Sequence, residues 1–261
     1  METPLRMALL ELGTEGARAG MAPFFEALRA RSGLSVEPAW FSTYEAMLSA
    51  APTLDLFWAP PLVAIALVAQ GLARPILACG RRGGVHYQSA LVVRHDSSIS
   101  RLEELAGKRV AWVSRTSAAG YAVPRLLLQI EGLDPAAMWR SEIFAGTHAT
   151  ALQAVVRRDA DVCAVYVARE PDGTAALPTA SGEVRVLRSV GPIPADVIAV
   201  RAGLDHGAVT ALTGGLMSMG DSELSTLAAI AQITAFEPVP VHHLEPLEKL
   251  VRLVRSSSRL A

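Results

Sequence analysis

Several side chains of this 261-residue sequence can donate hydrogen bonds from the ends of apolar runs. Each lies where a run of strand length begins or ends, or where the next helical pattern starts. Hydroxyl and imidazole groups can hold an oxyanion by hydrogen bonding without a full countercharge. The sequence therefore predicts a binding site for a small anion. Its side-chain donors are Tyr44, Tyr87, Thr116, Ser117 and His148.

Backbone groups at the same kind of position extend this set. Pro60 and Pro61 follow the apolar run 54–58, and Thr147 stands beside His148 at a helix start. In open α/β sheets, ligands bind beyond the carboxyl ends of strands, where helix N-termini present free N–H groups. Ser117 alone is typical of a helix N-cap, and Tyr87 alone is typical of a half-buried aromatic. Their recurrence at equivalent strand ends favours one shared cleft.

The usual catalytic motifs are absent from the sequence. The segment 13–20 is glycine-rich, but it is neither G-x-G-x-x-G nor a P-loop, and we expect a loop that leads into the first helix. There is no G-x-S-x-G elbow, no H-E-x-x-H and no close pair of carboxylates between strand ends. These absences argue against an enzyme, although a catalytic triad is assembled in space and need not leave a local motif.

Composition excludes some classes of partner. Apolar residues make up 51% of the chain and the net charge is −1, which favours a large folded core and argues against nucleic acid. Cys79 and Cys163 stand in apolar surroundings without metal-ligand spacing. We expect two buried free thiols, with a disulfide as the alternative, and no metal or other cofactor.

Neither an export signal nor a membrane span is evident. The N-terminal apolar run has no small-residue cleavage site, and no apolar run reaches 18 residues. The protein is expected to be cytoplasmic if the chain is complete, and periplasmic or lipid-anchored if a signal has been removed.

Strand-like runs alternate with helical patterns along almost the whole chain, which predicts an α/β fold with mainly parallel sheets. Pro38 restricts its strand to an edge or a bulge, and Pro61 and Gly71 bracket a helix. The last third is expected to be helical, and 172–183 to be a loop or hairpin. The predicted strands are 5–12, 34–41, 54–60, 89–95, 108–114, 161–167, 184–190 and 196–200. The predicted helices are 20–31, 42–50, 61–71, 100–107, 147–158, 206–219, 222–233 and 244–255.

Five segments together resemble the phosphate/phosphite/phosphonate-binding family of ABC-transporter substrate-binding proteins. The resemblance covers nearly the whole chain in the family's order. It implies a type 2 periplasmic-binding-protein fold, with two α/β lobes joined by two crossing hinge strands that close on a ligand. The lobes would be 1–94 plus 192–261 and 95–191, with the crossings near 94–97 and 190–194. The segments are TYEAML, LDLFWAPPLVAIAL, YQSALVVRHDSSISRLEELAGKRVAWVSRTSAAGYAVPRLLL, FAGTHATALQAVVRRDADVCAVY and GPIPADVIAV.

The resemblance also implies which residues bind the ligand. The oxyanion would be held by two tyrosines, by backbone next to a proline, by the hydroxyls of a T-S-T-S-G motif and by a histidine. An acidic residue would hold the amino group of an aminoalkyl phosphonate. The implied ligand-binding residues are Tyr44, Pro60, Tyr87, Thr116, Ser117, Ala118, His148 and Asp196.

The sequence departs from the family's pattern at the ligand motif. The T-S-T-S-G motif reads T-S-A-A-G here, so Ala118 and Ala119 replace two hydroxyl donors. Tyr166 and Val167 stand where an acidic residue usually follows a strand, and Ala195 stands beside Asp196 at the second acidic position. These departures argue against the aminoalkyl part of a phosphonate site.

We therefore expect a non-enzymatic protein that closes on a small oxyanion, phosphate-like or phosphonate-like, in the cleft between the lobes. Its partner would be an ABC-transporter permease, or a signalling protein if the chain is a ligand sensor. The alternative is an enzyme on the same fold, similar to chorismate dehydratase of the menaquinone pathway. His148, Tyr166 and Asp196 would then be the acid–base candidates.

Overall fold

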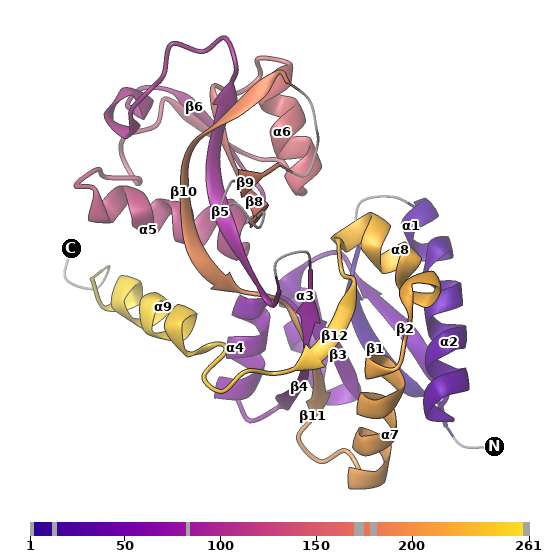
Figure 1. The fold of residues 1–261 in the computed structure, drawn as a ribbon. Helices are drawn as coiled ribbons and strands as arrows, with labels where there is room; N and C mark the ends of the chain where they lie inside the picture. The colour runs from indigo at the N-terminus through magenta and orange to yellow at the C-terminus, as the bar shows by residue number, and fades with distance from the viewer. Residues whose placement is uncertain (1–2, 12–14, 82–83, 170–174, 178–181, 258–261) are drawn as a thin grey trace. The chain divides into compact units, whose positions relative to one another are not determined.

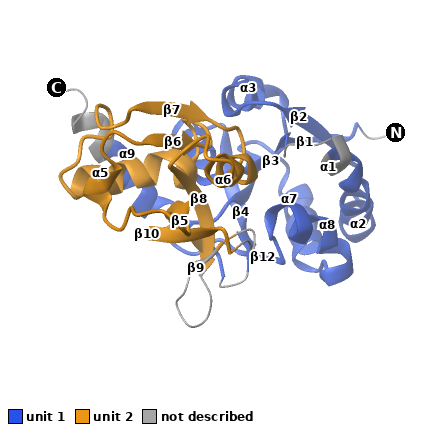
Figure 2. Ribbon diagram, turned by 90° about the horizontal axis from the view of Figure 1, so that it is seen from above, with its two compact units in different colours: residues 1–85, 194–261 blue, residues 86–193 orange. Residues whose placement is uncertain are grey.

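The computed structural model describes residues 3–11, 15–81, 84–169, 175–177 and 182–257. The chain divides into two compact units, residues 1–85 with 194–261 (unit 1) and residues 86–193 (unit 2), coloured separately in Figure 2. The strand 86–94 thus counts with unit 2, whereas the sequence placed it in the first lobe. The reason is that it pairs with a unit 2 strand from Gln88 to Val93.

Unit 1 contains a six-stranded mixed sheet with the order β12-β4-β11-β3-β1-β2 (Figure 1). β1 runs parallel to β2 and β3, while β11 runs antiparallel to β3 and β4. β1, β2, β3 and β4 therefore all end at one edge of the sheet, where β11 begins. The strands are β1 (Leu5–Leu10), β2 (Val36–Phe41), β3 (Leu56–Ala59), β4 (Ala73–Gly80), β11 (Val197–Arg201) and β12 (Ala235–Pro238).

Helices cover both faces of this sheet, because successive strand residues point to opposite faces and both sets are apolar. Leu56 and Trp58 of β3 belong to the core cluster shared with α2, α7 and α8. Phe57 and Ala59 belong to the cluster shared with α3 and α4. The helical elements of unit 1 are α1 (Glu15–Gly20), α2 (Ala22–Ser32), α3 (Tyr44–Ala50), η1 (Ala51–Thr53), α4 (Pro61–Ala69), α7 (His206–Met217), α8 (Asp221–Ala231) and α9 (Glu245–Ser257).

Unit 2 contains a sheet with the order β10-β5-β8-β6-β7, and β9 pairs with β8. β6 runs parallel to β7 and β8, and β5 runs antiparallel to β8. One edge of the sheet therefore gathers the carboxyl ends of β6, β7 and β8 with the start of β5. The strands are β5 (His86–Arg94), β6 (Arg109–Trp112), β7 (Ser141–Phe144), β8 (Val162–Arg169), β9 (Ala175–Ala176) and β10 (Val184–Pro194).

This second sheet also has a helix on each face. Residues of α6 share a core cluster with Ala90 of β5 and Val165 of β8. Residues of α5 share the other cluster with Leu91 and Ala164 of the same strands. The helical elements of unit 2 are the 3-10 turn η2 (Leu102–Leu105), the π-helical turn η3 (Ala118–Ala122), α5 (Val123–Ile130) and α6 (His148–Val156).

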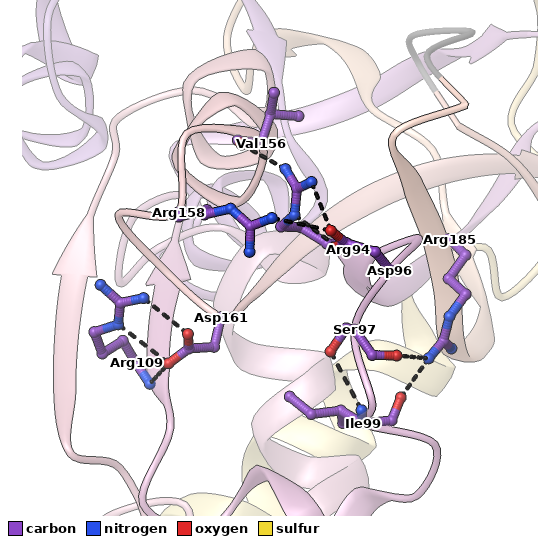
Figure 3. A network of polar contacts seen from close by, with 9 residues as sticks. All are labelled: Arg94, Asp96, Ser97, Ile99, Arg109, Val156, Arg158, Asp161 and Arg185. Atoms are coloured by element: carbon purple, nitrogen blue, oxygen red, sulfur yellow. Dashed lines mark hydrogen bonds and ion pairs between the residues drawn. The ribbon is translucent and has the colours of Figure 1, made fainter.

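Arginine–carboxylate contacts stabilise the edge of unit 2 where β5 ends and where β6 and β8 begin (Figure 3). Asp96 accepts hydrogen bonds from Arg94 and from Arg158, with the closest N–O distances at 2.8 and 2.9 Å. Arg109 makes a two-pronged contact with Asp161 at 3.1 and 2.8 Å. These pairs lie at the sheet edge opposite the ends of β6 and β8.

The α/β prediction is confirmed, and so are the predicted positions of most elements. Pro38 lies in β2, which is an edge strand as predicted. Thr43 caps α3 by accepting a hydrogen bond from the backbone N–H of Ala46 at 3.1 Å. Both cysteines are free and buried. Most of the segment 172–183 lies outside the described residues.

Other expectations were wrong. Residues 15–20 form α1, whereas a loop was expected. β4 and β7 were not predicted, and the last third contains β12 besides its helices. These three strands contain a proline or charged residues, which obscure the alternation typical of a strand. They are nevertheless held by their ladders with neighbouring strands.

Candidate functional site

Unit 1 places three of the predicted site residues at the edge where its parallel strands end. Tyr44 begins α3 after β2, and Pro60 directly follows β3. Asp196 directly precedes β11, whose Val197 pairs with Ala59 at the end of β3. Pro60 and Asp196 are therefore neighbours at one edge of the sheet.

The environment of Tyr44 keeps its phenol protonated. Burial raises the pKa of Tyr44 above its ordinary value, and the negative charges of Asp196 and Glu45 raise it further. A protonated phenol retains an O–H group that can donate a hydrogen bond to an anion.

Asp196 is already engaged within unit 1. Its Oδ2 accepts a hydrogen bond from Nη2 of Arg81 at 2.8 Å and from Nε1 of Trp58 at 3.2 Å. Arg81 directly follows β4 and also donates from Nε to the carbonyl oxygen of Ala231 at 3.0 Å. The carboxylate predicted to contact a ligand therefore forms an ion pair with a guanidinium of the protein.

Unit 2 brings together the other predicted side chains at its own sheet edge. Tyr87 lies at the start of β5, Ser117 follows β6, and His148 begins α6 after β7. The antiparallel register places Gln88 opposite Val167, so Tyr87 lies near the end of β8. The topology thus gathers residues that are distant in the sequence.

Tyr166 of β8 links two of these side chains. Its ring makes edge-to-face contacts with Tyr87 and with His148, at centroid distances of 6.4 and 4.9 Å. Its backbone N–H donates to Nδ1 of His148 at 3.2 Å. An accepting Nδ1 carries no proton, so the neutral imidazole holds its proton on Nε2 and can donate from there.

Ser117 caps the helical segment that follows β6. Its Oγ accepts a hydrogen bond from the backbone N–H of Gly120 at 3.0 Å, and the side chain is buried. This bond uses an acceptor site of the hydroxyl, so its O–H proton remains a possible donor. Thr116 lies 3.3 Å from Ser114 between their hydroxyl oxygens, and its side chain is half-buried.

A π-helical turn, η3, stands between Ser117 and α5. The backbone N–H of Ala122 donates to the carbonyl of Ser117, five residues earlier, at 3.0 Å. Pro124 has no N–H to give to the carbonyl of Gly120, and that carbonyl instead accepts from the N–H of Val113 at 3.1 Å. The turn is thereby tied to the end of β6.

The two alanines of the altered motif lie inside this turn. Ala118 and Ala119 are 6% and 2% exposed, so their methyl groups pack in the interior. The carbonyl of Ala119 accepts a hydrogen bond from Oγ of the fully buried Ser89 at 2.7 Å. The backbone of the motif is thus anchored to β5.

Sequence reasoning missed three contributors to these two groups. Arg81 was missed because β4 was not recognised as a strand, although a basic residue at its carboxyl end was a usable signal. Trp58 lies inside an apolar run and Ser89 begins one, and neither left a signal, because their roles depend on partners distant in the sequence.

Within the part of the chain that the structure describes, no three His, Cys, Asp or Glu side chains come together as a metal site requires. None of the described helices is long and apolar enough to cross a membrane.

The sequence matches one protein family over residues 14–244. That family is described as the periplasmic substrate-binding protein of phosphonate ABC transporters. No curated protein matches the chain.

Several solved structures share the fold at low sequence identity. XAC2383 from Xanthomonas citri, solved with bound ATP, is 22% identical with a TM-score of 0.77, over 98% of this chain and 99% of that one. PA3383 from Pseudomonas aeruginosa, a binding-protein component of an ABC phosphonate transporter, is 18% identical with a TM-score of 0.78, over 95% and 86%. PhnD1 from Prochlorococcus marinus, in complex with methylphosphonate, is 16% identical with a TM-score of 0.78, over 96% and 98%. The type 2 periplasmic-binding-protein fold predicted from the sequence is thereby confirmed.

Proposed function

Because the chain belongs to the family of periplasmic substrate-binding proteins of phosphonate ABC transporters, we propose that it binds a small phosphate-like or phosphonate-like oxyanion. Members of this family are solute receptors and not enzymes. The chain is accordingly a non-enzymatic binding protein.

The choice of an oxyanion as the proposed ligand rests on one observation. In unit 2, Tyr87, Ser117 and His148 come to one sheet edge from three separate elements, and Tyr166 contacts two of them. Each of the three is a neutral donor when Nε2 of His148 holds the proton. Neutral donors suit an anion that is bound and later released, because they stabilise it without a fixed countercharge.

Unit 1 would supply the rest of the binding set. Its contribution is the protonated phenol of Tyr44 and the backbone beside Pro60, with Asp196 acting through Arg81. Thr116 and the backbone at Ala118 would complete the contribution of unit 2.

The test measures ligand affinity of the whole chain by calorimetry. Phosphate, phosphite and methylphosphonate are compared with an alkyl sulfonate and acetate. Ser117→Ala and His148→Ala should each weaken binding of the best anion by roughly 10- to 100-fold, because a hydrogen bond to a charged group contributes about 1.5–3 kcal/mol. A ligand at 100 times its Kd should also add about 2.7 kcal/mol to the free energy of unfolding.

Two matched substitutions control for non-specific effects. Ser225 is an exposed serine of α8, and His206 is the exposed first residue of α7, as His148 is the first residue of α6. Ser225→Ala and His206→Ala should leave the affinity unchanged. If no oxyanion raises the thermal midpoint, or if Ser117→Ala and His148→Ala bind as the unaltered chain does, the proposal fails.

The family implies a small-molecule ligand and a permease as partner. We extend this to the chain as a periplasmic receptor that delivers its ligand to an ABC permease. A pull-down with and without ligand would separate this role from sensing. Recovery of a permease supports transport, and ligand-dependent recovery of a signalling protein supports a sensor.

A further inference from the structure

The Arg81–Asp196 pair stands at the edge of unit 1 that also holds Tyr44 and Pro60. Its closest atoms, Nη2 and Oδ2, are 2.8 Å apart, and the two side chains are only 11% and 15% exposed. Trp58 donates to the same oxygen at 3.2 Å. Arg81 is held in turn by the carbonyl of Ala231 at 3.0 Å. Each member of the pair is thus fixed by a second contact.

Because of the position of Asp196, this ion pair can affect which ligands the protein binds. Its charge acts on the phenol of Tyr44, whose pKa it raises. A bare carboxylate at this place would attract a cationic substituent and repel an oxyanion. Pairing with Arg81 removes the net charge, so the carboxylate of Asp196 already has a cationic partner within the protein.

We propose that Arg81 is a specificity-determining residue: by forming an ion pair with Asp196, it makes the protein select oxyanions without a cationic substituent and reject aminoalkyl phosphonates. This inference rests on the proposed function, because it concerns the ligand of the same site. Specificity of this kind arises from a group that excludes the wrong ligand as much as from contacts to the right one.

Two ligands of nearly equal shape test the inference. Propylphosphonate and 2-aminoethylphosphonate differ in a terminal methyl group against an ammonium group. Calorimetry on the whole chain should show at least about tenfold tighter binding of propylphosphonate. In Arg81→Gln the carboxylate of Asp196 loses its cation, and the ratio of the two affinities should shift by at least about tenfold toward 2-aminoethylphosphonate.

A second pair in unit 1 provides a matched control. Arg201 forms an ion pair with Asp55 at 2.8 Å, at the opposite edge of the same sheet. Arg201→Gln should leave the affinity ratio unchanged. The double variant Arg81→Gln/Asp196→Asn has neither charge and should not gain affinity for 2-aminoethylphosphonate.

The outcomes separate the two levels of the proposal. If the unaltered chain binds neither inorganic phosphate nor propylphosphonate, the proposed function and this inference both fail. If it binds propylphosphonate and the ratio is the same in Arg81→Gln, only this inference is overturned. If Arg81→Gln does not fold, the affinity of Asp196→Asn for propylphosphonate tests the inference instead. That variant leaves the guanidinium uncompensated, so propylphosphonate should bind more tightly, and an unchanged or lower affinity overturns the inference.

Discussion

At the scale of single residues, the environment of a side chain decides what it can do in binding. Tyr44 illustrates this, because burial and two carboxylates keep its phenol protonated. Since the folded state raises this pKa, the stabilising contribution of the protonated phenol is complete below the unfolded value of about 10 and is lost as the pH rises above it.

Tyrosinate absorbance tests this directly. The chain has four tyrosines. In the folded protein, Tyr44→Phe and the unaltered chain should show the same rise in tyrosinate absorbance between about pH 9 and 11, because Tyr44 does not ionise in that range. In denaturant, the same substitution should remove a quarter of the total change. If Tyr44→Phe also lost a quarter of the absorbance change in the folded protein, this would contradict the assignment of a protonated Tyr44.

The sequence predicted that candidate site residues stand next to strand ends, and the structure places Tyr44, Ser117 and His148 there. It could not predict that Asp196 is engaged by Arg81, because the two are 115 positions apart. Their contact exists only because β11 inserts beside β4. Position along a strand is a local property, whereas ion pairing across a sheet depends on the topology.

At the scale of elements, the π-helical turn η3 depends on one glycine. A Cβ atom on Gly120 would lie 2.4 Å from Cγ2 of Val113 and 2.8 Å from Oγ of Ser117. These neighbours are the side chain of Val113, which directly follows β6, and the serine that caps the turn. The turn therefore keeps its shape only while position 120 has no side chain.

Gly120→Ala should destabilise the protein by about 1–3 kcal/mol, because overpacking forces the backbone of the turn to shift. Urea unfolding measures this change, and the affinity for the oxyanion should fall as well because Ser117 is displaced. Gly214→Ala is the control. Nothing lies within 4 Å of its new Cβ, and it sits in α7, so this change should stabilise by about 0.5–1 kcal/mol. Equal effects of the two substitutions would contradict the role of the turn.

The sequence marked Ser117 as a typical helix N-cap, and the structure places it at the N-cap of η3. The π-helical form of the turn could not be predicted, because it depends on where the carbonyl of Gly120 finds its donor. That donor is the N–H of Val113, at the end of a strand whose position is set by β7 and β8.

At the scale of the whole molecule, the net charge of −1 contributes little to stability, and individual ion pairs matter more. Asp96 is the clearest case. Its hydrogen bond from Arg94, and less strongly the charge of Arg158, lower its pKa from 3.8 to about 2. Since the folded-state pKa is depressed, the contribution is present above the unfolded value and is lost as the pH falls toward the folded one.

Stability should therefore decline between about pH 4 and pH 2 more steeply in the unaltered chain than in Asp96→Asn. The measurement is the urea midpoint as a function of pH. Arg94→Gln should remove most of the difference, whereas Arg158→Gln should keep most of it, since Arg94 is the larger cause. Identical slopes for the unaltered chain and Asp96→Asn would contradict the role of this pair.

The alternation of apolar runs and helical patterns was enough to predict the fold class, because both sheets are covered by helices on both faces. The unpredicted strands β4, β7 and β12 owe their conformation to pairing with partners. The central place of β11 between β3 and β4 also has no local signal, since β11 follows both of these strands by more than 100 residues in the sequence.

The insertion of β11 also bears on the order in which the molecule is made by the ribosome. Unit 2 is one uninterrupted stretch and can acquire its structure during synthesis. Unit 1 cannot, because β4 pairs only with β11 and β12 among the described strands, and both are translated after unit 2. The N-terminal segment therefore cannot complete its sheet until β11 has been translated and can insert between β3 and β4.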